Sequence, residues 1–218
     1  MPCSEPQGVE SQMDLFLQCW GGAFYLLNKI CFSVGERKNE RKKRHFRIAG
    51  WVVYLLGVPA WVIILVLKDN WIAASIEAGA IPSMLFGLYN VVANSRTPNR
   101  LFDRVTSFWT YFFILMGTGY SIVEYGGITS FSQYLEIGAM VGFLMGSYLL
   151  AKNRIYGWPF FMLMNASMGT LMLIQSKPIL AIQQGVSLCF VVYGFFAAKK
   201  RNTHKQGGYR GQEPSALE

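Results

Sequence analysis

The side chains that could bind a small molecule lie inside long apolar runs. Glu77 lies about two turns into the run that begins at Trp71, and Gln183 and Gln184 lie in another run nearer the C-terminus. A carboxylate or amide is costly within a membrane unless it is paired or faces water, so these groups should face the interior of a helix bundle. There they would bind sugar or ribose hydroxyls, and Glu77 would also attract a cation. The alternative is a structural hydrogen bond between helices, worth about 1 kcal/mol or less.

Asn165 is a further candidate, because it lies seven residues after Trp158 and so on the same face of a helix. Phe161 falls near that face as well. A flat ring would stack on the indole and hydrogen-bond to the amide beneath it. The indoles of Trp158 and Trp51 have a second explanation, since tryptophans near helix ends also anchor proteins in the membrane interface. For Asn165, in mid-run, binding is the better explanation.

The two tryptophans belong to an internal repeat. The segment from Arg47 to Trp51 recurs from Arg154 to Trp158, a displacement of 107 positions. Two further pairs keep this displacement without a gap: Glu77 with Gln184, and Gly87 with Gly194. Internal repeats in a membrane chain indicate a transporter.

Seven apolar runs are each close to the roughly 20 residues that cross a bilayer core. They cover residues 13–34, 48–67, 71–92, 105–125, 132–151, 156–175 and 178–198. Their polarity does not alternate as in the strands of a membrane barrel, so we expect an all-α integral membrane protein with seven transmembrane helices. The first run is unusually polar, with Asp14, Asn28 and Lys29. It either lines a solute path or is a poorly defined span.

The repeat sets helices one to three against helices five to seven, with helix four as a linker. Because a single helix separates the units, they are parallel repeats related by an axis near the membrane normal. The predicted parts are an extracytoplasmic segment (1–12), a first three-helix repeat (13–92), the linker helix with its loops (93–131), a second repeat (132–198) and a disordered cytoplasmic tail (199–218). We also expect a solvated basic loop at 35–46 and a kink at Pro82, either as a hinge or as a tolerated proline.

The net charge of +8 would suit nucleic acid, but its placement does not. Of the lysines and arginines, 17 lie on one side of the predicted helices and two on the other, with Lys29 inside the first span. This bias puts the N-terminus outside and the C-terminus in the cytoplasm. The expected partners are a lipid bilayer and a small-molecule substrate, without nucleic acid. The oligomeric state stays open, a homo-oligomer included.

Catalysis is not expected. Cys3, Cys19, Cys31 and Cys189 lack the spacing of a metal site or a disulfide framework. The chain has no nucleophile elbow, phosphate loop or pair of carboxylates that could act as acid and base. We therefore predict no enzyme activity, no metal and no cofactor.

Residues 132–200 resemble the PnuC family of vitamin B3 nucleoside transporters, in the superfamily that also contains the SWEET carriers. The resemblance depends on the basic segment before Trp158, on Asn165, and on Gln184 followed by Tyr193-Gly194. Phe161 stands where the family often has a second tryptophan. In the first copy, Glu77 and Val58 stand where amides would be expected.

The resemblance implies facilitated diffusion of nicotinamide riboside across a bacterial inner membrane, by alternating access of the two repeats. It also implies ligand contacts from Trp158, Asn165 and Gln184. A sugar carrier of the same fold, or a membrane adaptor or receptor subunit that recruits a partner through 35–46 and the tail, are the alternatives. The full predicted binding set is Trp51, Glu77, Trp158, Phe161, Asn165, Gln183 and Gln184.

Overall fold

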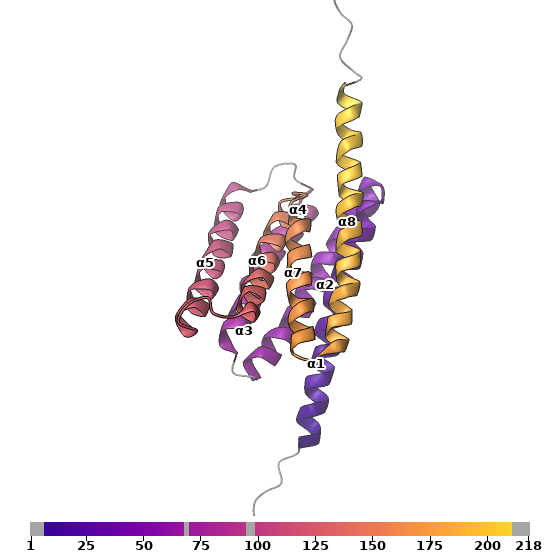
Figure 1. The fold of residues 1–218 in the computed structure, drawn as a ribbon. Helices are drawn as coiled ribbons and strands as arrows, with labels where there is room; N and C mark the ends of the chain where they lie inside the picture. Colours follow the sequence, from indigo (N-terminus) through magenta and orange to yellow (C-terminus); the bar gives the residue numbers. More distant parts are fainter. Residues whose placement is uncertain (1–6, 68–69, 95–98, 211–218) are drawn as a thin grey trace, which may run out of the picture.

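The computed structural model describes residues 7–67, 70–94 and 99–210, and this part of the chain consists of helices joined by short turns, without strands (Figure 1). The helices are α1 (Gln7–Glu36), α2 (Glu40–Leu67), α3 (Trp71–Gly79), α4 (Ile81–Val92), α5 (Arg100–Glu124), α6 (Phe131–Ala151), α7 (Gly157–Ile174) and α8 (Pro178–Arg210). The prediction of an all-α chain is confirmed.

Five stretches of the described chain are long and apolar enough to cross a membrane. They are Glu40–Leu67, Trp71–Val92, Phe131–Ala151, Gly157–Ile174 and Pro178–Thr203. The protein is therefore a multi-pass membrane protein. The helices α1 and α5, which cover the other two predicted spans, are not among the five. In α1, the polar side chains of Asn28 and Lys29 are buried inside the bundle instead of facing lipid.

The five apolar stretches and α1 pack side by side into a closed ring. The helix α1 contacts α2 and α8, and α2 contacts both α3 and α4. On the far side, α4 contacts α6, α6 contacts α7, and α7 contacts α8, which completes the ring. The helix α5 lies outside the ring, against α3, α4 and α6, at the left edge of Figure 1. Buried aromatic and aliphatic side chains of the ring helices fill its centre.

The third predicted span is broken at the proline that predicted a kink. The helix α3 ends at Gly79 and α4 begins at Ile81, with Pro82 in its first turn. Proline lacks the amide hydrogen and clashes with the preceding turn, so the helix restarts there. Pro59, by contrast, lies inside α2 without ending it.

The basic segment at 35–46 is not the loop that we expected. The helix α1 continues to Glu36 and α2 begins at Glu40, so most of the segment is helix on either side of a short turn. Within it, Lys43 forms an ion pair with Glu36.

Both predicted terminal segments are also partly helical. The tail that we expected to be disordered from 199 continues α8 as far as Arg210, and residues 211–218 lie outside the described chain. At the other end, α1 begins at Gln7, inside the predicted N-terminal segment 1–12.

Candidate functional site

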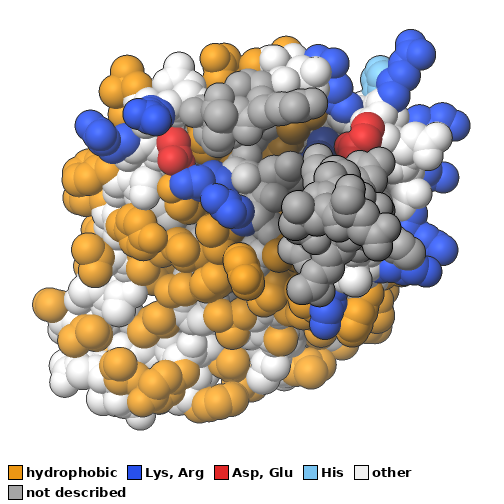
Figure 2. Space-filling model, turned by 90° about the horizontal axis from the view of Figure 1, so that it is seen from above, with side chains coloured by type: hydrophobic (Ala, Val, Ile, Leu, Met, Phe, Trp, Pro, Cys, Tyr) orange, Lys and Arg blue, Asp and Glu red, His pale blue; other side chains and the backbone are white. Residues whose placement is uncertain are grey.

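One end of the ring, formed by residues 37–47, 152–154 and 199–201, is rich in lysine and arginine; we call it the basic end. Figure 2 looks onto this end and shows Lys and Arg side chains gathered there, with hydrophobic side chains lower on the flank. Glu36 lies beneath these cations and is only 4% exposed. Its carboxylate accepts from Lys43 at 2.5 Å and from Arg47 at 2.8 Å. Arg201 of α8 lies 3.9 Å away and also pairs with Glu40.

The environment of Glu36 favours its charged form. Burial alone would raise the pKa of this carboxyl group, but the charges and hydrogen bonds of Arg47 and Lys43 outweigh burial and lower the pKa below its ordinary value of 4.5. The carboxylate therefore stays ionised at neutral pH and holds the cations around it.

Three contacts at the basic end join the first three spans to the last three. Arg201 of α8 bonds to the backbone oxygen of Glu36. Arg47 of α2 donates to Asn153, between α6 and α7, at 2.5 Å, and Asn90 of α4 donates to the carbonyl of Ala151 at 3.0 Å. This end of the ring is closed by polar contacts.

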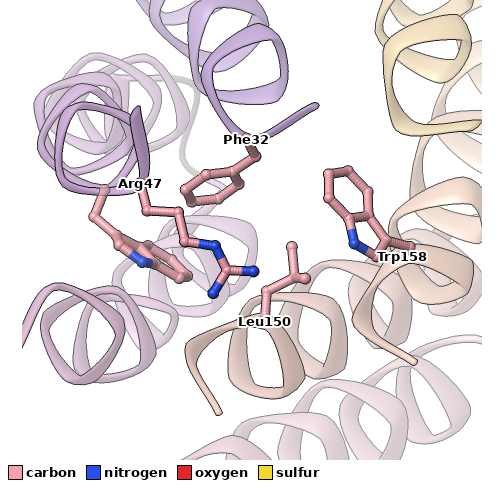
Figure 3. Close-up of a pocket in the computed structure, with 5 residues that line it drawn as sticks. Phe32, Arg47, Leu150 and Trp158 are labelled. Atoms are coloured by element: carbon pink, nitrogen blue, oxygen red, sulfur yellow. The ribbon is translucent and has the colours of Figure 1, made fainter. Parts of the chain in front are cut away.

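A small cavity lies under these contacts, lined by Phe32, Arg47, Trp51, Leu150 and Trp158. Its volume is about 10 Å³, close to the least that a single water needs. Figure 3 shows the Arg47 guanidinium pointing into the space between Phe32, Leu150 and Trp158. The two repeated tryptophans therefore meet at one site.

Each of these tryptophans packs on the glycine that lies 36 residues after it in the sequence. A Cβ built on Gly87 would lie 2.3 Å from the ring of Trp51, and one on Gly194 would lie 2.4 Å from the ring of Trp158. The indoles are 1% and 2% exposed. An interfacial anchor has to reach the lipid headgroups, so the structure does not support that explanation for either tryptophan.

A second layer lies one helical turn farther from the basic end, and Lys29 is its centre. Lys29 is 1% exposed, and its Nζ has no hydrogen-bond partner among the described residues. The Nζ lies 3.4 Å from the ring centre of Phe161 and 4.7 Å from that of Tyr54. These two rings are each three residues beyond a repeated tryptophan, and each is 0% exposed.

The ring contacts do not compensate Lys29 fully. Taking an ammonium out of water costs several kcal/mol even after the surroundings relax. A cation over an aromatic face recovers about 2 kcal/mol when it is desolvated. A buried lysine in this situation marks a functional site more often than a structural one.

Glu77 belongs to a third layer, one more turn along α1. It accepts a hydrogen bond of 2.5 Å from the hydroxyl of Tyr25, which lies four residues before Lys29. Glu77 is half-buried, and no ion pair joins it to Lys29 in the described part of the chain. Its side chain reaches Tyr25 of α1 from the last turn of α3, just before the break at Pro82.

Asn165 lies at the same depth as Tyr25, one turn beyond Phe161 on α7. It is 1% exposed, and its Nδ2 donates to the carbonyl of Phe161 at 2.7 Å. Its Oδ1 has no partner among the described residues. Asn28, beside Lys29, also has an unpaired Oδ1, because its Nδ2 donates to Gly50. Two buried side-chain oxygens therefore have no hydrogen-bond partner in the part of the chain that the structure describes.

Gln183 and Gln184 lie apart from the cavity. Gln183 donates to the carbonyl of Gly22 on α1 at 2.9 Å, and Gln184 packs against Gly169 on α7. Gly22 is ten residues before Phe32, so Gln183 lies roughly 15 Å along α1 from the cavity. Of the predicted set, the structure brings together Trp51, Trp158 and Phe161, places Asn165 one turn away, and separates Gln183 and Gln184 from them.

Comparison with known proteins adds no assignment. The chain matches no protein-family model, no curated protein and no solved structure. The resemblance to vitamin B3 nucleoside transporters therefore stays a prediction from the sequence.

The sequence analysis gave no role to several residues of the site. Tyr54 has the same 107-residue relation to Phe161 that links the tryptophans, so the repeat itself could have found it. Lys29 was visible as the one lysine or arginine within a predicted span. For Tyr25 the sequence contains no such signal, since its bond to Glu77 joins residues 52 positions apart.

Proposed function

We propose that the protein carries a small polar solute across the membrane through the centre of the helix ring, by alternating access. The two moving units are the helices α1 to α4 and the helices α6 to α8, and α5 links them. The observation that carries this proposal is the buried polar centre: Lys29, Asn28 and Asn165 have unpaired atoms within a membrane-spanning bundle. A purely structural core would pair these groups or replace them by apolar side chains.

The packing supports a repeat. The first triplet meets the second through α1 with α8 and through α4 with α6, which is the pattern that a twofold axis along the bundle would produce. Trp51 with Gly87 and Trp158 with Gly194 form the same contact in the two units. Each unit thus supplies one of the two tryptophans that line the small cavity.

The basic end is the cytoplasmic end in this proposal, because positively charged segments stay on that side. The contacts of Glu36, Arg47 and Asn90 then close the carrier on its cytoplasmic side. Opening requires the two units to part at these contacts while they stay together at the other end, where Gln183 holds Gly22.

The first substrate to test is nicotinamide riboside, which the sequence resemblance favours. Aromatic faces at Tyr54 and Phe161 would hold a flat ring. Acceptors at Asn165 and Glu77, one turn away, would bind ribose hydroxyls. A bacterial inner membrane is the location that this substrate implies.

The test is uptake into liposomes. Purified protein should accumulate radiolabelled nicotinamide riboside when a kinase that traps it is enclosed, and should only equilibrate it without the kinase. The matched variant is Asn165→Val, which copies the residue at the repeat position Val58 and removes the unpaired acceptor. It should fold normally and lose uptake.

If folded wild-type protein takes up no nicotinamide riboside but a sugar raises its melting temperature, the solute is a sugar and not a nucleoside. If the protein binds neither nucleosides nor sugars, the carrier proposal is wrong.

A further inference from the structure

Lys29 is the feature that a neutral or cationic solute leaves unexplained. Its ammonium reaches the centre of the bundle, in van der Waals range of Phe161, and lacks a carboxylate within ion-pair distance among the described residues. Glu77, the nearest acidic candidate, is engaged by Tyr25 instead. Among the described residues, the amine of Lys29 therefore has no hydrogen-bond or ion-pair partner, whereas the carboxylate of Glu77 already has a donor.

Two unpaired acceptors lie in the same part of the bundle, Asn28 next to Lys29 in the chain and Asn165 one turn beyond Phe161. The unpaired oxygens of Asn28 and Asn165 require hydrogen-bond donors, whereas the unpaired nitrogen of Lys29 requires an acceptor. A ligand that satisfies all three must carry an acidic or strongly accepting group together with hydroxyl or N–H donors. A flat ring on that ligand would be held by Tyr54 and Phe161.

A positively charged solute fits this arrangement poorly. The pyridinium ring of nicotinamide riboside would enter beside an ammonium in a region of low dielectric, where like charges repel strongly. A carboxylate on the same ring reverses this interaction, because it would form a charge-assisted hydrogen bond with Lys29.

We propose that Lys29 binds an anionic group of the substrate, so that the preferred solute is a flat-ring carboxylate and not the corresponding amide. The inference deepens the proposed carrier function and rests on it. Lys29 is then a specificity-determining residue, and its present position over Phe161 is its position in the unloaded protein.

The experiment uses two solutes that differ only in this group, nicotinic acid riboside and nicotinamide riboside. Their dissociation constants are measured by calorimetry with the full-length protein in detergent. Wild-type protein should bind the acid about tenfold more tightly or better, which is the effect of one hydrogen bond to a charged group. Lys29→Met should remove this preference by weakening binding of the acid while binding of the amide stays the same or improves.

Lys177→Met is the matched control, because Lys177 is exposed and lies beyond the far end of α7, at the end of the ring opposite the basic end. It should leave both dissociation constants unchanged. If Lys29→Met does not fold, Lys29→Gln, which removes the charge and keeps a polar tip, replaces it.

The outcomes separate the two proposals. Tighter binding of the amide by wild-type protein, or an equal loss of both ligands in the Lys29 variant, overturns the role of Lys29 and leaves the nucleoside carrier standing. Failure of folded wild-type protein to bind either riboside overturns both. A merely structural lysine would change the affinity for acid and amide by the same factor.

Discussion

Glu36 and Lys29 are two buried charges on one helix with opposite surroundings. They are seven residues apart on α1, about two turns, and so lie on the same face. Glu36 is 4% exposed and Lys29 is 1% exposed. Three cations surround the carboxylate, whereas the ammonium lies against aromatic faces and has no carboxylate within ion-pair distance in the described part of the chain. Burial alone therefore does not tell a structural charge from a binding one; the presence or absence of a counter-charge does.

The largest expected loss of stability comes from substitution of Glu36, the buried charge that has counter-charges. Glu36→Gln leaves Lys43, Arg47 and Arg201 close together without their carboxylate. Removing one partner of a buried ion pair costs about 3–5 kcal/mol. The midpoint of thermal unfolding in detergent should fall sharply.

Glu40→Gln is the control, since Glu40 also pairs with Arg201 but its side chain is 68% exposed. Exposed pairs contribute about 0–1 kcal/mol, so the control should melt close to wild type. Equal losses in the two variants would contradict the compensated role of Glu36.

The next largest loss of stability is expected where Trp51 and Trp158 pack on glycines. Gly87→Ala and Gly194→Ala would each push a methyl group into an indole ring. Overpacking of this kind costs about 1–3 kcal/mol. Gly185→Ala, on α8 with open space around it, should melt at or above the wild-type temperature. Similar melting of all three variants would show that the tryptophans have room to move.

Substitution of Lys29, the buried charge without an ion-pair partner among the described residues, should not lower the stability of the protein. Lys29→Met replaces an unpaired buried ammonium by an apolar side chain of similar length, and the protein should keep its stability or gain up to about 2 kcal/mol. The same variant loses the preference for the acid described above. A large loss of stability would mean that Lys29 is a structural element after all.

The smallest expected effect is the dependence of stability on pH. The pKa of Glu36 is lowered in the folded protein, so its ion pairs contribute stability that is complete above the ordinary value of 4.5 and is lost as the pH falls through the folded value. Melting temperatures should be compared between wild type and Glu36→Gln from neutral pH downwards. Their difference should shrink only below about pH 4.5; a constant difference would contradict the assignment.

The sequence predicted the parts of the molecule that repeat or follow composition. Apolar runs predicted the helices, Pro82 predicted the break, and the 107-residue register predicted that Trp51 and Trp158 are equivalent. Both tryptophans line the same small cavity.

What the sequence did not predict depends on how α1 is rotated in the bundle. The position of Lys29 between two rings, and the bond from Tyr25 to Glu77, require a register between helices that are far apart in the chain. The first unit also shares few residues with the second, so the repeat offered no template for α1. The helical basic segment was missed for a related reason, since its ion pairs join α1, α2 and α8.

The separate capping of α3 and α4 has a mechanical consequence. Asn70 caps the start of α3, the amide of Ala80 closes its end, and Pro82 opens α4. Because Pro82 has no amide hydrogen to donate, bending at this joint would break fewer backbone hydrogen bonds than bending within α3 or α4. Glu77 lies next to this joint, so bending there would change the distance of its carboxylate from Tyr25 without unwinding a helix.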